Sequence, residues 1–165
     1  MVGTILPVLL VAACLGILTG LRTFTPLTVL AWELHLRRMS ILGSNLSFLH
    51  TTAAVVILTI LALGELTADK LPRTPSRLQA PGMLGRSIFG VLCGMVAAQA
   101  WGGNWETCAL TGLVGAAIGA LLGYKVRTRL APRLRCPDFA MALAEDAVAI
   151  GGSLLVVARA IRLPF

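Results

Sequence analysis

Four acidic side chains and one arginine stand inside, or at the ends of, long apolar segments. Glu65 and Asp69 are four residues apart, Glu145 and Asp146 are adjacent, and Arg22 ends the first apolar segment. A charged side chain in the hydrocarbon core of a bilayer costs about 2.5–3.5 kcal/mol on insertion scales, so it normally faces a partner, a cavity or water. These five residues are therefore the first candidates for chemistry.

One interpretation makes the acids a site for a proton or a cation, because carboxylates brought together in a low dielectric share protons readily. Arg22 comes just before Thr25 and Pro26, where an N-cap followed by a first-turn proline predicts a new helix. The N-terminus of that helix carries partial positive charge and would, together with Arg22, attract an anion. Lys70 and Lys125 complete the predicted substrate- and ion-binding residues.

The alternative interpretation makes the same charges internal clamps between helices. In that case Glu65 and Asp69 would pair with Lys70 or Arg86, and Glu145 or Asp146 with Lys125 or Arg129. The sequence alone leaves both interpretations open for the acids. For Arg22 it favours a function, because a basic residue at a helix break is costly for packing alone.

The composition decides what kind of element must position these charges. The chain has 165 residues, 57% of them hydrophobic and 13% charged, with a mean hydropathy of +0.87. Soluble domains carry about 45–50% apolar and about 25% charged residues. We therefore predict an integral membrane protein with an all-α fold, a single transmembrane domain over residues 1–165.

Five apolar segments are long enough to be predicted as spans, since a helix crosses the hydrocarbon core in about 20 residues. They cover residues 2–19, 47–66, 83–101, 107–124 and 138–158. A shorter segment, residues 26–38, follows the break at Arg22 and is predicted to be re-entrant or interfacial. Trp101 and Trp105 are expected to anchor the turn between the third and fourth spans at the membrane surface.

The basic residues predict the orientation. The regions after the second and fourth spans hold nine of them: Lys70, Arg73, Arg77, Arg86, Lys125, Arg127, Arg129, Arg133 and Arg135. By the positive-inside rule these loops are cytoplasmic and face anionic lipid, so an inside N-terminus leads through five spans to an outside C-terminus. This assignment leaves five arginines on or near the outer side: Arg22, Arg37, Arg38, Arg159 and Arg162.

Glycines are spaced for close helix contacts, because small residues four apart let backbones approach. The candidates for helix packing are Gly16, Gly20, Gly90, Gly94, Gly115, Gly119 and Gly123. Such a short chain makes a thin bundle, so we expect a homodimer, with the glycine faces of the third or fourth span as candidate contacts.

A similar pattern ends the first and fourth spans, and this predicts an internal repeat. Gly16 and Gly20 precede Arg22 in the first, and Gly119 and Gly123 precede Lys125 in the fourth. The following spans each carry an acid. Since one span intervenes, spans 1–2 and 4–5 would cross in opposite senses, as in the inverted repeats of many transporters.

Signatures of enzymes, cofactors and metals are absent from the sequence. It contains no nucleophile elbow, phosphate loop or dinucleotide fingerprint. The four cysteines are scattered and the two histidines, His35 and His50, have no partner one helical turn away. We expect no enzymatic activity, no cofactor, no metal site and no nucleic-acid partner.

The pattern of charges and glycines resembles one known family. Gly20-Leu21-Arg22 with Pro26, the segment Glu65-x-x-x-Asp69-Lys70-x-Pro72, the glycine-rich stretch ending at Lys125 and Arg129, and Glu145-Asp146 are similar to the domain of unknown function 4126 family. The resemblance implies a multi-pass protein of the bacterial inner membrane, without an assigned activity.

These observations lead to two functional hypotheses. The first is a small transport protein (a channel, carrier or lipid translocator) that moves an ion or small solute past Glu65, Asp69, Glu145 and Asp146, with Arg22 meeting an anion. The second is a non-transporting membrane scaffold or interaction protein, whose buried charges are structural clamps.

Overall fold

The computed structural model describes residues 2–41, 45–68, 80–130 and 138–162, and over these ranges the chain is helical and contains no strand. Its α-helices are α1 (Val2–Leu21), α2 (Thr25–His35), α3 (Thr52–Ala68), α4 (Ala80–Trp101), α5 (Trp105–Lys125) and α7 (Asp138–Arg162). A short 3-10 helix, η1 (Ser47–His50), precedes α3, and a π-helical turn, η2 (Val126–Leu130), continues α5. The predicted all-α bundle is confirmed.

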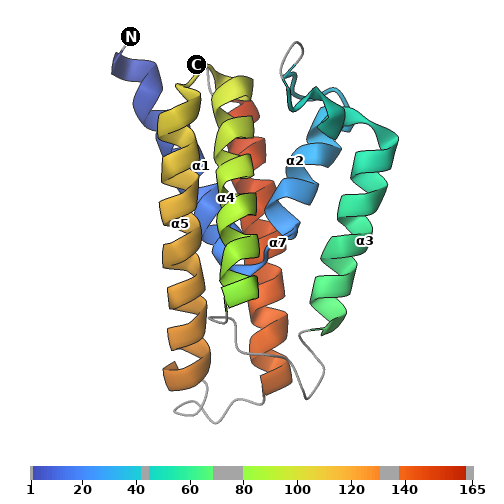
Figure 1. The fold of residues 1–165 in the computed structure, drawn as a ribbon, viewed down its shortest axis with the longest axis vertical. Coiled ribbons are helices and arrows are strands. Elements are labelled where there is room, and N and C mark those ends of the chain that lie inside the picture. The colour runs from blue at the N-terminus through green and yellow to red at the C-terminus, as the bar shows by residue number, and fades with distance from the viewer. Residues whose placement is uncertain (1, 42–44, 69–79, 131–137, 163–165) are drawn as a thin grey trace.

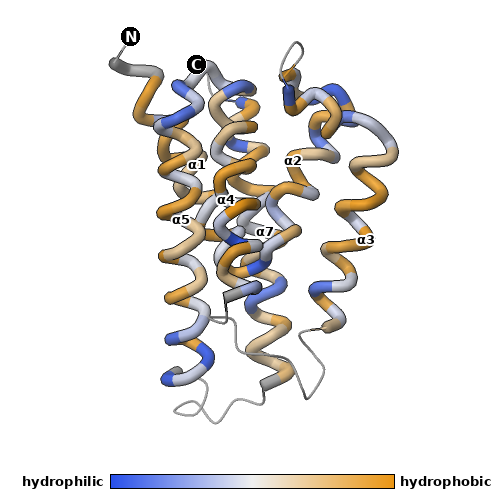
Figure 2. Tube along the Cα trace, viewed as in Figure 1, coloured by the Kyte–Doolittle hydropathy of each residue, from blue (hydrophilic) through white to orange (hydrophobic). Residues whose placement is uncertain are grey.

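Three helices are long and apolar enough to cross a membrane, as in an integral membrane protein. They cover Pro81–Trp101, Trp105–Arg129 and Phe139–Arg162. Two more helices, Ile5–Leu21 and Thr52–Ala68, are apolar but shorter. Hydrophobic residues run along most of the helices, whereas hydrophilic residues lie at both ends of α5, around the end of α2 with η1, and in the lower part of α7 (Figure 2).

Small residues bring α1 and α5 into backbone contact. A Cβ atom added at Gly16 would overlap the backbone of Gly112, and one added at Gly20 would overlap the backbones of Ala116 and Ala120. Only glycine therefore fits at these two positions of α1. The residue numbers rise together along both helices, so α1 and α5 run parallel.

This parallel packing overturns the predicted inverted repeat. The repeat requires the first and fourth predicted spans, which are α1 and α5, to run in opposite senses, but the contacts of Gly16 and Gly20 place them in the same sense. The resemblance between their glycine patterns has a simpler cause, because the glycines of α1 and those of α5 pack against each other.

The glycines of α4 are also used inside the chain. A Cβ at Gly90 would press on Gly112 and Ala116, and one at Gly94 would overlap the backbone of Cys108. These contacts are antiparallel, and they meet Gly112 and Ala116, the same residues of α5 that α1 approaches. The glycine faces predicted to join two copies of the chain are therefore already occupied by α1, α4 and α5 of a single copy.

The first two helices form a re-entrant pair. Starting at the end of the bundle marked N, α1 stops about halfway along it, and α2 returns to the same end beside α3 (Figure 1). Because α2 reverses the direction of α1, the beginning of α1 and the end of α7 lie at the same end of the bundle (Figure 1). This differs from the predicted arrangement, in which the two ends lie on opposite sides.

Polar contacts fasten α3 to α2 at the edge of the bundle. The Thr28 hydroxyl donates to the Leu58 carbonyl at 3.1 Å, and the Trp32 indole donates to the Thr59 hydroxyl at 3.1 Å. Most of α3 is otherwise open to its surroundings, with Val55, Leu58 and Ala62 as its buried residues. The re-entrant helix α2 thus connects α3 to α1, α4 and α7.

Candidate functional site

The break between α1 and α2 lies in the interior of the bundle. The Arg22 amide still bonds to the Leu18 carbonyl at 2.9 Å, and α2 begins three residues later, at Thr25, with Pro26 in its first turn. The amide groups that open a helix have no partner within it. In an apolar interior they need an acceptor from elsewhere in the protein.

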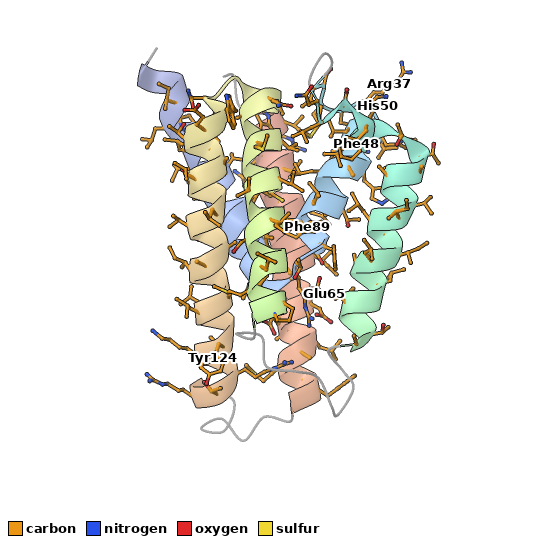
Figure 3. The ribbon with its side chains drawn as sticks, in the orientation of Figure 1. Arg37, Phe48, His50, Glu65, Phe89 and Tyr124 are labelled. Atoms are coloured by element: carbon orange, nitrogen blue, oxygen red, sulfur yellow. The ribbon has the colours of Figure 1, made fainter. Side chains whose placement is uncertain are left out.

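Glu65 of α3 supplies that acceptor. Its two carboxylate oxygens accept hydrogen bonds from the backbone amides of Thr23, at 2.7 Å, and Phe24, at 3.0 Å. Figure 3 shows Glu65 on the side of α3 that faces the rest of the bundle. A carboxylate at a helix N-terminus is stabilised both by hydrogen bonds and by the partial positive charge of the helix.

This cap corrects one prediction from the sequence. Thr25 was expected to be the N-cap of the second helix, but the N-cap is Phe24, and no side chain adjacent in sequence caps the helix. The capping carboxylate comes from 41 and 42 residues away along the chain. Local sequence rules cannot anticipate a cap supplied by another helix.

An ion pair stands next to the cap. Arg22 is fully buried, and its guanidinium pairs with the carboxylate of Asp146 on α7, whose side chain is 9% exposed. Two charges removed from water in this way stabilise each other only if they remain together. The pair therefore fixes the end of α1 against α7, and the Glu65 cap fixes the start of α2 against α3.

The predicted placement of these charges is wrong in one respect. Arg22 was expected on or near the outer side of the membrane, and the partners expected for the acids did not include it. The structure joins Arg22 to Asp146 and brings Glu65 to the adjacent residues, because α1 ends inside the bundle. The sequence proposed Lys70 or Arg86 for Glu65 and Lys125 or Arg129 for Asp146. Asp146 instead pairs with Arg22 and Glu65 accepts from backbone amides, while Lys70 lies outside the described residues.

Several buried hydroxyls surround the break, and the sequence pattern marked Thr25 alone among them, as an expected N-cap. They belong to Thr19, Thr23, Thr25, Thr28 and Ser153. The Thr19 hydroxyl donates to the Leu15 carbonyl at 2.8 Å and lies 3.6 Å from the Cys93 sulfur. The hydroxyl of Thr25 is buried and has no hydrogen-bond partner among the described residues. The sequence does carry a signal for these hydroxyls, because four threonines stand on both sides of Arg22 within one apolar stretch.

Arg86 adds a second buried cation near the same level. It is 6% exposed on α4, one residue after Gly85, whose position faces the Thr23 side chain. Phe89, one turn further along α4, packs edge to face on Phe24 with ring centroids 4.8 Å apart. The break is thus enclosed by α3, α4 and α7.

The other predicted site residues lie elsewhere. Glu145 is half-buried and Lys125 is exposed at the end of α5, so neither belongs to the break. Asp69 and Lys70 lie outside the described residues. The glycines predicted for helix packing line the contacts among α1, α4 and α5, and Gly123 is buried on α5. Within the described parts of the chain, no group of three His, Cys, Asp or Glu residues could hold a metal ion.

The arrangement concentrates polar chemistry at one level of an apolar bundle. A carboxylate holds the amides at a helix start, while an arginine and an aspartate neutralise each other beside it. Each oxygen of the Glu65 carboxylate accepts from one of the two amides, so the contact between the start of α2 and α3 depends on this side chain.

Comparison with known protein families identifies the family of the chain. The model of a family described as Domain of unknown function (DUF4126) matches residues 9–163. Neither a curated protein nor a solved structure matches the chain.

Proposed function

The chain belongs to the family of domain of unknown function DUF4126, and from its geometry we propose that it is a small transport protein of the bacterial inner membrane. It would move an ion or small solute as a channel, carrier or lipid translocator. The observation that carries the proposal is the fully buried Arg22, paired with Asp146 at a helix break inside the bundle.

The break supports transport for a physical reason. Non-helical backbone at membrane depth is tolerated only where protein or a water-filled path surrounds it, and transporters use broken helices to bind ions. A scaffold needs neither a re-entrant pair nor a buried arginine, since apolar residues would pack as well at lower desolvation cost. The hydroxyls of Thr23 and Thr25 add polar groups at the same level.

The proposed mechanism makes α2 the moving element. Protonation of Glu65, or binding of a cation beside it, weakens the cap on Thr23 and Phe24 and frees two amide donors. With its N-terminal contact released, α2 can shift relative to α3, and the freed amides together with Arg22 attract an anion. Return of the Glu65 charge restores the cap, which completes the cycle.

One observation favours the rival function, a non-transporting scaffold. Both Glu65 and Asp146 have partners within the protein, as expected of structural clamps. The two functions differ in whether these charges ever exchange a proton or an ion. Flux measurements therefore separate them directly.

We predict that Glu65→Gln removes transport while preserving the fold. The amide keeps one acceptor oxygen for the helix start but cannot lose or gain a proton. Purified protein in liposomes loaded with a pH-sensitive dye, under an imposed potassium diffusion potential, should carry protons faster than empty liposomes. Glu65→Gln should lower this flux by about a hundredfold or more, in line with the contribution of a positioned proton-transfer group.

Glu106→Gln is the matched control, because this exposed acid lies at the opposite end of the bundle, in the first turn of α5. Its flux should equal that of the unmodified protein. Equal flux in Glu65→Gln and Glu106→Gln would show that the Glu65 cap takes no part in transport. Unmodified protein that carries neither protons, sodium nor chloride above the empty-liposome rate would favour the scaffold.

The orientation can be tested separately from transport. The basic residues that end α5 and form η2 are proposed to be cytoplasmic by the positive-inside rule. We predict that cysteines introduced at Thr4, near the start of α1, and at Glu106 react with a membrane-impermeant maleimide added outside intact cells, whereas a cysteine at Arg129 reacts only after the membrane is opened. Labelling of Thr4 and Glu106 from opposite sides would contradict the re-entrant pair.

A further inference from the structure

A laterally open groove lies below the end of α1. It has a volume of about 260 Å³ and runs between α5 with η2 on one side and α7 on the other. It exists because α1 stops at Leu21, so the lower halves of α5 and α7 continue without a helix between them (Figure 1). The re-entrant arrangement therefore creates a gap in the surface that would face lipid.

The walls of the groove are mainly apolar. Ile17 and Leu21 close it at the end of α1, Leu122 lines the α5 side, and Met141 and Val148 line the α7 side. Leu122 is 49% exposed and Val148 is 55% exposed, so the groove opens to the surroundings of the bundle rather than into its core. Its shape and chemistry suit a flexible hydrocarbon chain.

One basic and one acidic side chain line the groove, and two more basic residues stand on the adjoining turn of α5 and η2. Arg127 of the π-helical turn η2 lines it, and Lys125 and Arg129 stand exposed on the same turn of chain. Glu145 of α7 is the acidic residue among those that line the groove. Figure 3 marks this end of α5 by Tyr124, an aromatic residue of the kind enriched at membrane surfaces.

We propose that this groove binds an anionic phospholipid of the surrounding bilayer. One acyl chain lies along the apolar walls, and the phosphate contacts Arg127 together with Lys125 or Arg129. The inference rests on the membrane placement of the proposed function but does not require that the protein transports anything. It assigns the basic end of α5 to a specific lipid site rather than to general attraction by the membrane surface.

Charge complementarity favours lipid over a second copy of the chain. Two copies related by an axis along the membrane normal would bring the same basic turn of each copy to the same level, and like charges would meet. An anionic head group neutralises those charges instead, and its acyl chain is already surrounded by hydrocarbon. The groove therefore fits an anionic lipid better than it fits the same groove of a second copy of the chain.

The test is native mass spectrometry of the purified protein in detergent, titrated with palmitoyl-oleoyl phosphatidylglycerol or with the zwitterionic phosphatidylcholine of the same chains. Phosphatidylglycerol should bind more tightly. The double variant Arg127→Gln/Arg129→Gln should weaken its binding about fivefold per basic residue, or about 25-fold in total, and leave phosphatidylcholine nearly unchanged.

Two further variants locate the site. Ala144→Leu, at an exposed position lining the groove, should weaken both lipids because the larger side chain occupies the path of the acyl chain. Arg159→Gln/Arg162→Gln removes the same charge from the opposite end of α7 and should leave both affinities unchanged. Glu65→Gln, which tests transport, should also leave lipid binding unchanged, so the two proposals can fail separately.

Three results would overturn the proposal. One is equal loss of phosphatidylglycerol binding in the two arginine double variants, which would indicate general electrostatics. Another is full displacement of the lipid by soluble glycerol phosphate at equal concentration, which would indicate a phosphate site without a chain site. The third is a change of oligomeric mass in Ala144→Leu with unaltered lipid binding, which would assign the groove to a second copy.

Discussion

Replacing Arg22 with glutamine should lower the free energy of unfolding by about 3–5 kcal/mol, the cost typical of removing one member of a buried ion pair. Arg22 is fully buried and pairs with Asp146, whose side chain is 9% exposed. The variant leaves the Asp146 carboxylate in an apolar interior without that cation. The measurement is the unfolding transition of the purified protein in mixed micelles as the fraction of denaturing detergent rises.

The double variant Arg22→Gln/Asp146→Asn should recover most of this loss, because two neutral amides can replace the pair without leaving a charge buried. The matched control is the surface pair Arg38–Glu33, with 3.3 Å between its atoms and the arginine side chain 63% exposed. Arg38→Gln should change stability by less than about 1 kcal/mol. If Arg22→Gln costs no more than Arg38→Gln, the ion pair does not hold α1 to α7.

Gly119→Leu should destabilise the protein by about 3 kcal/mol or more, and it is the packing substitution with the largest expected effect. A Cβ at this position would overlap the backbone of Ile17 and touch the Cα of Gly20. Because these are backbone atoms, no rotamer change can relieve the overlap, and α1 and α5 must move apart. Separation of the two helices also displaces Arg22, at the end of α1.

Gly64→Leu is the control for the same chemical change. No atom lies within 4 Å of a Cβ added at Gly64 on α3, so the new side chain meets open space. Leucine is a better helix former than glycine, which should leave stability unchanged or raise it by up to about 1 kcal/mol. Equal destabilisation by both substitutions in the same detergent titration would contradict the close α1–α5 contact.

The residues of the site could be found from the sequence, but their partners could not. Arg22, Glu65 and Asp146 stand out because charges are rare in apolar segments. Glu145 and Asp146 are adjacent and differ by about 100° in direction around a helix, and nothing local shows which of them meets Arg22. The Glu65 cap joins residues more than 40 positions apart, beyond the reach of any local pattern.

For the glycines too, the sequence reveals the positions that make contacts but not the partners of those contacts. Spacing of four residues correctly marked positions of α1, α4 and α5 that are found in close helix contacts. It did not show whether the contacts lie within one chain or between two, or whether the helices run parallel. Both questions depend on where α1 turns, which is a property of the assembled bundle.

The amino-acid sequence by itself determined an all-helical chain with membrane-length apolar helices, a break after Arg22 and the family to which the chain belongs, because hydropathy, proline and charge act over a few residues. The tertiary structure alone decided that α1 ends inside the bundle, that α2 returns beside it, and that Glu65 and Asp146 meet the break from two other helices. These features depend on contacts between distant segments, where each buried polar group must find its partner in three dimensions.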